Sequence, residues 1–185
     1  MATPRESPDR DAGRGGGTCP SARHGRRAGR TVTENVNCRA TPDQLAAWRA
    51  LYRADSLLFA ALNEQLRTGV GIVYFEREVL DALHRGGGRL RMGALAAELM
   101  ISRSGTTRLV ARMEKCGWVR RESVPEDRRA TCAELTDTGR DVLHRAQPIV
   151  DAVVAAFFGR YLSTVALKNC AVALTTLTDA NSGPG

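Results

Sequence analysis

The sequence predicts a mainly helical α+β chain with one small β-hairpin. Apolar residues recur at three- and four-residue steps over long segments, which is the periodicity of amphipathic helices. One central stretch instead has two short runs of strand character around the polar segment VPEDRRA, residues 124–130. The apolar content of 43% is sufficient for a folded core, and 185 residues suit one domain with a tail.

Residues 1–40 are rich in Arg, Gly, Pro and Ser and contain few large apolar side chains. Such a segment buries too little surface to offset its ordering entropy, so we expect a disordered basic tail. The tail can hold nucleic acid weakly, or it is a dispensable extension. We expect order over residues 41–180 and a flexible end at residues 181–185.

The first helix is predicted to begin at Thr41-Pro42-Asp43, which supplies an N-cap, a proline at the first helical position and an acid in the first turn. Its apolar periodicity continues to about Leu66. The expected elements after it are a helix ending at Gly86, a short strand at 89–91, a short helix at 92–99, a helix from Ser102 to about Cys116, strands at 118–124 and 130–135, a long helix from Thr136 bent at Pro148, and a last helix at 163–178.

Two short helices joined by a tight turn and followed by a basic hairpin match the plan of a winged helix-turn-helix. One half of the 102–116 helix carries short hydroxyls and arginines, which suit entry into a major groove, whereas an ordinary solvated face is the alternative. Helical spacing also groups Thr106 with the core side. The candidate DNA-contacting residues of this helix are Ser102, Arg103, Ser104, Thr106, Thr107, Arg108 and Arg112.

The hairpin would form the wing. Arg128 and Arg129 are expected at its tip, where a guanidinium can enter the minor groove, and Asp127 is expected to brace Arg129 by a hydrogen bond. Arg120 and Arg121 at the base are expected to contact phosphates. An ordinary polar turn is the simpler alternative.

Charge is unevenly distributed along the chain. Residues 85–129 carry 11 Arg and Lys against 5 acids, a net charge of +6 within a total of +7. This block points to a polyanionic partner. Five widely spaced cysteines without C-x-x-C, and three scattered histidines, predict no disulfide framework, no metal site and no cofactor. Without a signal peptide or an apolar run of membrane length, a cytoplasmic protein that does not contact membranes is expected.

The stretch MGALAAELMISRSGTTRLVARMEKCGWVRRESVPEDRRATCAELTDTGRDVL, from Met92 to Leu143, resembles the core of MarR-type transcriptional regulators. The shared pieces are T-R-L-V-x-R-[LM]-E, G-[LW]-V-x-R, D-x-R and L-T-x-x-G, whereas the local order of the family's E-L-A is changed here. The resemblance covers about residues 42–178.

The resemblance implies a homodimer that binds a palindromic double-stranded DNA operator. The DNA-binding lobe would span about residues 85–136, between dimerisation helices at about 41–67 and 137–178. Family members usually repress transcription and release DNA when a small aromatic or anionic effector binds. Five aromatic side chains are candidates to line such a pocket, although simple core packing is favoured: Trp48, Tyr52, Phe59, Tyr74 and Phe75.

Three other functions are weighed against this one. A thiol-based redox sensor of the same fold would use Cys38, because Cys116 and Cys132 are expected to be small core residues. An enzyme is disfavoured, because the sequence has no nucleophile elbow, P-loop or acid pair. A winged-helix adaptor for proteins would not need so many arginines on one surface.

Overall fold

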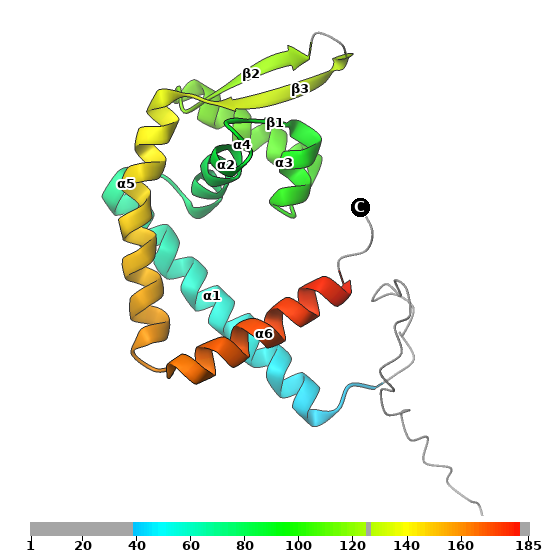
Figure 1. Ribbon diagram of the computed structural model, residues 1–185, viewed down its shortest axis with the longest axis vertical. Helices are drawn as coiled ribbons and strands as arrows, with labels where there is room; N and C mark the ends of the chain where they lie inside the picture. The colour runs from blue at the N-terminus through cyan, green and yellow to red at the C-terminus, as the bar shows by residue number, and fades with distance from the viewer. Residues whose placement is uncertain (1–38, 125–126, 182–185) are drawn as a thin grey trace, which may run out of the picture. The chain divides into compact units, whose positions relative to one another are not determined.

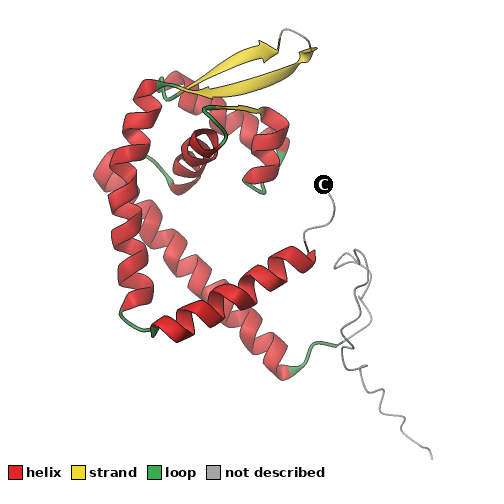
Figure 2. Cartoon of the chain, in the orientation of Figure 1, coloured by secondary structure: helices red, strands yellow, loops and turns green. Residues whose placement is uncertain are grey.

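The computed structural model describes residues 39–124 and 127–181, without the side chains of residues 124–130. The mainly helical fold with one small antiparallel sheet is confirmed (Figures 1 and 2). Its elements are α1 (Pro42–Val70), α2 (Tyr74–Arg85), β1 (Arg89–Arg91), α3 (Met92–Glu98), α4 (Arg103–Lys115), β2 (Val119–Val124), β3 (Asp127–Leu135), α5 (Asp137–Val154), the π-helical turn η2 (Ala155–Gly159) and α6 (Thr164–Asn181).

The described residues fall into two units, 41–172 and the flanking residues 39–40 and 173–181. The second unit contains the last turns of α6. The expectations for residues 1–38 and 182–185 lie outside the described residues. In the described part of the chain no single helix is long and apolar enough to cross a membrane; the bent pair Asp137–Gly159 and Thr164–Asn181 meets those criteria only when taken together.

Helix α1 begins as its sequence predicts and continues to Val70, beyond the expected end at about Leu66. The Thr41 side chain accepts a hydrogen bond from the Gln44 backbone N–H, and the Gln44 side chain accepts one from the Thr41 N–H, which forms a capping box. At the other end Gly71 has a φ of 76° and its N–H donates to the carbonyls of Leu66 and Arg67. Glycine adopts this left-handed conformation without a steric cost, so the helix ends there.

The sheet has the order β1-β3-β2, with β3 in the centre and every pair antiparallel. The register pairs Ser123 with Thr131 but Val124 with Asp127, so β3 has extra residues at this step, as in a β-bulge. Strand β3 begins at Asp127, three residues earlier than expected. The prediction that Asp127, Arg128 and Arg129 form the turn is wrong: their backbone belongs to strand β3.

One hydrophobic cluster joins the elements of the helix-turn-helix to the sheet and to the two long helices. Figure 1 shows α2, α3 and α4 gathered beneath the hairpin, with α5 running from β3 alongside α1. The largest fully buried side chains of this core include Leu66 of α1, Leu80 and Leu83 of α2, Leu95 of α3, Met113 of α4 and Leu135 of β3. Burial of this kind contributes roughly 1.5–3 kcal/mol per large side chain.

The junction between the sheet and α5 is tightly packed. Thr136 caps α5: its Oγ1 accepts from the Gly139 N–H and donates to the carbonyl oxygens of Gly117 and Trp118. Gly139 is buried against Trp118, the residue before β2, and a Cβ at this position would overlap the Trp118 carbonyl oxygen. The L-T-x-x-G segment therefore fixes the start of α5 to the start of β2. The helix then continues through Pro148.

Candidate nucleic-acid interface

Helix α4 starts at an N-cap that the sequence predicts. The Ser102 Oγ accepts a hydrogen bond from the Gly105 N–H at 3.1 Å. The Thr106 Oγ1 donates to the Ser102 carbonyl oxygen at 3.1 Å, and Thr106 is 0% exposed. Thr106 therefore packs in the core and does not reach a ligand, which corrects its place among the candidate DNA-contacting residues. Its helical spacing with Val110 and Met113 is the signal that indicates this burial.

The opposite side of α4 is exposed and polar. Arg103, Ser104, Thr107 and Arg108 all lie on this side, and the Thr107 Oγ1 donates to the Arg103 carbonyl oxygen at 2.9 Å. Short hydroxyl side chains beside two long guanidinium groups leave a helix surface that can approach another backbone closely. The structure thus places four of the candidate residues on one accessible face.

Arg112 points elsewhere. Its Nε donates to Glu76 Oε1 of α2 at 2.8 Å, while Glu76 Oε2 accepts from the Val73 N–H at 2.8 Å. Glu76 is only 5% exposed, so its carboxylate requires these partners. Arg112 therefore ties α4 to the N-terminus of α2, and its expected DNA contact stays a prediction.

The arginines at the base of the hairpin are also paired with acids. Arg120 contacts Glu122 and Glu134, each at 3.0 Å. The Arg121 guanidinium contacts the Glu114 carboxylate at 2.6 Å. The hydrogen bond from Arg121 is the main cause that holds the pKa of Glu114 below its usual value, and the bond from Arg120 does the same for the pKa of Glu134. The expected phosphate contacts of Arg120 and Arg121 therefore compete with carboxylates already in place.

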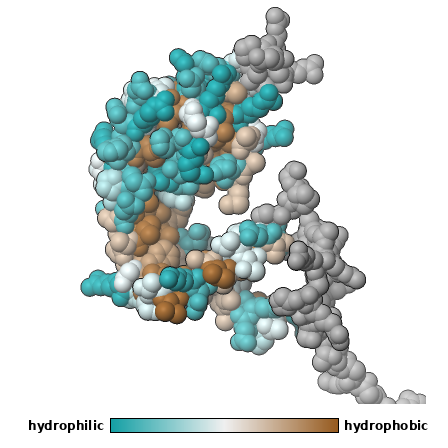
Figure 3. Space-filling view, viewed as in Figure 1, coloured by the Kyte–Doolittle hydropathy of each residue, from teal (hydrophilic) through white to brown (hydrophobic). Residues whose placement is uncertain are grey.

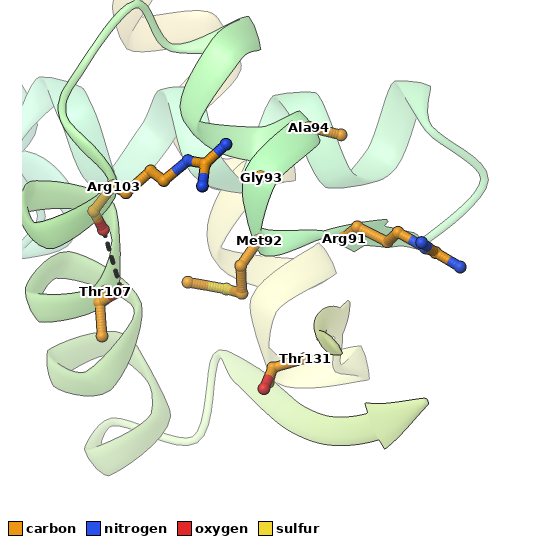
Figure 4. A pocket seen from close by; sticks show the side chains of 7 residues that line it. All are labelled: Arg91, Met92, Gly93, Ala94, Arg103, Thr107 and Thr131. Carbon is orange, nitrogen blue, oxygen red and sulfur yellow. Dashed lines mark hydrogen bonds between the residues drawn. The ribbon is translucent and has the colours of Figure 1, made fainter. Parts of the chain in front are cut away.

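A hollow of about 400 Å³ opens between α3, α4 and β3 (Figure 4). In this view Arg103 extends from α4 toward α3, Met92 projects between them, and the Arg91 guanidinium points away on the far side. The residues lining the hollow include Arg91, Met92, Ala94, Arg103, Thr107 and Thr131. Sequence reasoning did not select Arg91, although its place in the alternating R-L-R strand predicts an exposed side chain.

The described basic residues differ in whether an acid is already bound to them. Arg85, Arg89, Arg112, Arg120 and Arg121 each contact a carboxylate. Within the described residues, no ion pair is formed by Arg91, Arg103, Arg108 or Lys115, and these four lie on or beside α3 and α4. The side chains of Asp127, Arg128 and Arg129 lie outside the described part of the chain, so the expected brace at the wing stays a prediction.

Three of the five aromatic candidates for a ligand pocket come together at the junction of α1 and α2. The rings of Phe59, Tyr74 and Phe75 pack on one another with centroids 5.6–6.0 Å apart. Burial, followed by the nearby Glu78, raises the pKa of Tyr74. Trp48 and Tyr52 are 61% and 66% exposed on α1 and do not join the cluster, so core packing within the chain does not explain them.

The cysteines follow the expectation only in part. Cys132 is buried in β3, as a small core residue would be, whereas Cys116 at the end of α4 is exposed, which corrects the expectation for that residue. Cys38 lies outside the described residues. Among the residues that are described, no group of His, Cys, Asp and Glu is arranged to hold a metal ion.

Known proteins share this sequence pattern and fold. A family model described as "MarR family" matches residues 76–130. Sco3205 of Streptomyces coelicolor, a MarR family transcriptional regulator solved in complex with DNA, is 32% identical with a TM-score of 0.72, and the match covers 78% of this chain and 91% of Sco3205. AbsC of the same organism, also a MarR family transcriptional regulator, is 30% identical with a TM-score of 0.70, covering 77% of this chain and 97% of AbsC.

A curated relative matches over a shorter stretch. The transcriptional regulator HosA of Escherichia coli O111:H- is 39% identical over 67 residues, which is 36% of this chain. The chain spans 50% of the length of HosA.

Proposed function

Because the chain belongs to the MarR family of transcriptional regulators, which are not enzymes, we propose that it is a homodimeric repressor that reads a palindromic double-stranded DNA operator through α4 and the β2–β3 wing. A small aromatic or anionic effector would release it from the operator. We place the DNA contacts on the exposed face of α4 and on the hairpin. The chemistry of these side chains supports the proposal.

The single observation that carries the DNA-binding proposal is the exposed face of α4. Arg103 and Arg108 extend from this face, and no carboxylate pairs with either of them among the described residues. An unpaired guanidinium can bind a base edge or a phosphate without first breaking an ion pair. Ser104 and Thr107 between them are small enough to let the helix lie in a major groove.

Exposed apolar side chains on the long helices support the homodimer. Leu51 on α1 is 46% exposed, and on α6 and the turn before it Val165 and Tyr161 are 67% and 76% exposed. Figure 3 shows hydrophobic residues gathered over the long helices, while the face of the hairpin lobe is mostly hydrophilic. A twofold symmetric partner would cover this surface.

The junction of α1 and α2 supports an effector response. Beside the Phe59–Tyr74–Phe75 cluster, the Tyr74 N–H donates to the Asn63 side chain of α1 at 3.0 Å. Two residues further along α2, Glu76 holds Arg112 of α4. A ligand that displaces the rings would therefore act on the same helix end that positions α4, and it would shift the DNA-binding equilibrium by its preference for one arrangement.

DNA selection followed by fluorescence anisotropy tests this function. The protein should enrich palindromic fragments from a random pool, and light scattering should give about twice the chain mass of 20.0 kDa. Arg108→Ala should reduce discrimination among operator variants, by about 1–3 kcal/mol for one base contact. Arg160→Ala, at an exposed site in the turn before α6, is the control for a general loss of positive charge. A wild-type protein that binds all duplexes equally would contradict the proposal.

A further inference from the structure

The hollow between α3, α4 and β3 combines two kinds of lining. Arg91 and Arg103 supply positive charge on two sides of it, with Met92 between them. Thr107 and Thr131 line the same space from α4 and β3. A ligand that fits this lining has negative groups separated by a less polar part.

We propose that this hollow seats one stretch of the DNA sugar–phosphate backbone, with Arg103 and Arg91 binding phosphates on either side of a deoxyribose that lies over Met92. The inference rests on the proposed function. It adds three residues to the interface that are not among the candidate DNA-contacting residues of α4 and the wing: Arg91, Met92 and Thr131.

The charge environment favours Arg91 over its neighbour on the same strand. Arg89 and Arg91 are both exposed on β1 and both follow the alternation of a strand, so they present equivalent positive charges. Arg89 lies 3.8 Å from the Glu122 carboxylate, and it pairs across the sheet with Glu134 in the strand register. Arg91 is paired in the register with Cys132 and has no acidic partner among the described residues. Phosphate binding at Arg91 therefore displaces no internal ion pair.

The position of the hollow beside α4 gives the proposed phosphate binding a function. Phosphate contacts fix the orientation of a protein on the duplex, and base contacts then read the sequence. Arg103 is the first residue of α4 and Arg91 immediately precedes α3, so a backbone segment held between them would fix both helices of the helix-turn-helix at their N-terminal ends. We infer that Arg91 is a positioning residue for the entry of α4 into the groove.

The salt dependence of DNA binding tests the proposal. Arg91→Gln removes one arginine–phosphate interaction in each protomer, so the slope of log K against log salt should become less steep by about 0.9 for each interaction removed. For one such interaction, the loss of affinity between 50 and 200 mM salt should be about 3.5-fold smaller in the variant than in the wild type. The reduction in affinity should be similar for operator and unrelated duplexes. Arg89→Gln changes the charge equally and should leave the slope nearly unchanged.

A duplex with single methylphosphonate substitutions locates the bound phosphate. Replacing that phosphate by its neutral analogue should weaken wild-type binding and have little further effect on Arg91→Gln, because the two changes remove the same interaction. Equal effects of Arg91→Gln and Arg89→Gln, without coupling to any phosphate, would overturn the proposal while leaving operator binding by α4 intact. A wild-type protein without DNA affinity would instead refute the proposed function itself. Unchanged thermal unfolding of both variants confirms that each is folded.

Discussion

Gly139→Ala tests the junction that joins the sheet to α5. A methyl group at this position would overlap the Trp118 carbonyl oxygen and approach Leu135 Cδ1 to 2.8 Å. The Trp118 oxygen cannot move freely, because it also accepts hydrogen bonds from the Thr136 Oγ1 at 2.9 Å and from the Thr136 N–H at 3.2 Å. Accommodating the methyl group therefore requires β2 and α5 to separate.

Three contributions set the expected magnitude. Forcing extra volume into a packed site costs about 1–3 kcal/mol. Weakening the two hydrogen bonds to the Trp118 oxygen costs about 1–2 kcal/mol in total. Alanine recovers up to about 1 kcal/mol over glycine in a helix. The net expectation is a decrease of about 2–4 kcal/mol in the free energy of unfolding.

Denaturant unfolding at a fixed protein concentration measures this decrease, and Gly93→Ala is the matched control. Gly93 is also in a helix, α3, but a Cβ there would meet no atom within 4 Å. The control should be more stable by about 0.5–1 kcal/mol, because only the helix propensity changes. If Gly139→Ala is as stable as the wild type or more stable, the tight junction is not present in solution and the reasoning fails.

Two further predictions concern the charged residues. Arg112→Ala should lower the free energy of unfolding by about 1–2 kcal/mol, because it leaves the buried Glu76 carboxylate with the Val73 N–H alone. Adding Glu76→Gln should recover part of that stability in the same unfolding assay, because a neutral amide is cheaper to bury than a carboxylate. A double variant that is less stable than Arg112→Ala would contradict this. Arg129→Ala should weaken operator binding by about 1–3 kcal/mol. Asp127→Ala should weaken it too if the carboxylate orients Arg129, whereas tighter binding in anisotropy titrations would show that the carboxylate only repels DNA.

Local features of the fold could be predicted from the sequence because their causes are local. Thr41, Ser102 and Thr136 are short hydroxyl residues placed just before an amphipathic segment, and each caps a helix as its own neighbourhood predicts. The burial of Thr106 could likewise be predicted from its helical spacing. The bulge in β3 could not, because it depends on how two strands are paired and not on either strand alone.

The candidate site was harder to predict, because ion pairs between residues far apart in the sequence decide which arginines are free to bind DNA. Arg112 meets Glu76 across 36 positions, so nothing near this arginine shows that it is occupied. Arg120 meets Glu134 across 14 positions as well as the nearby Glu122, so its own neighbourhood shows only part of its pairing. Arg91 is the opposite case. Its neighbourhood looks like that of Arg89, yet of the two only Arg89 has a carboxylate partner among the described residues, Glu122 of β2.

These ion pairs change the interpretation of the net positive charge of residues 85–129. Of the 11 basic residues between positions 85 and 129, five arginines already neutralise a carboxylate in the structure. Since each such pair must be disrupted before its arginine can replace a DNA counterion, net charge overstates the number of phosphates that the lobe can bind. The paired arginines hold α2, α4 and the sheet in register, so substituting them should be seen first in stability. The described arginines of this block that form no ion pair, Arg91, Arg103 and Arg108, lie just before α3 and along the first half of α4, and substituting them should be seen first in the affinity for DNA and in its salt dependence.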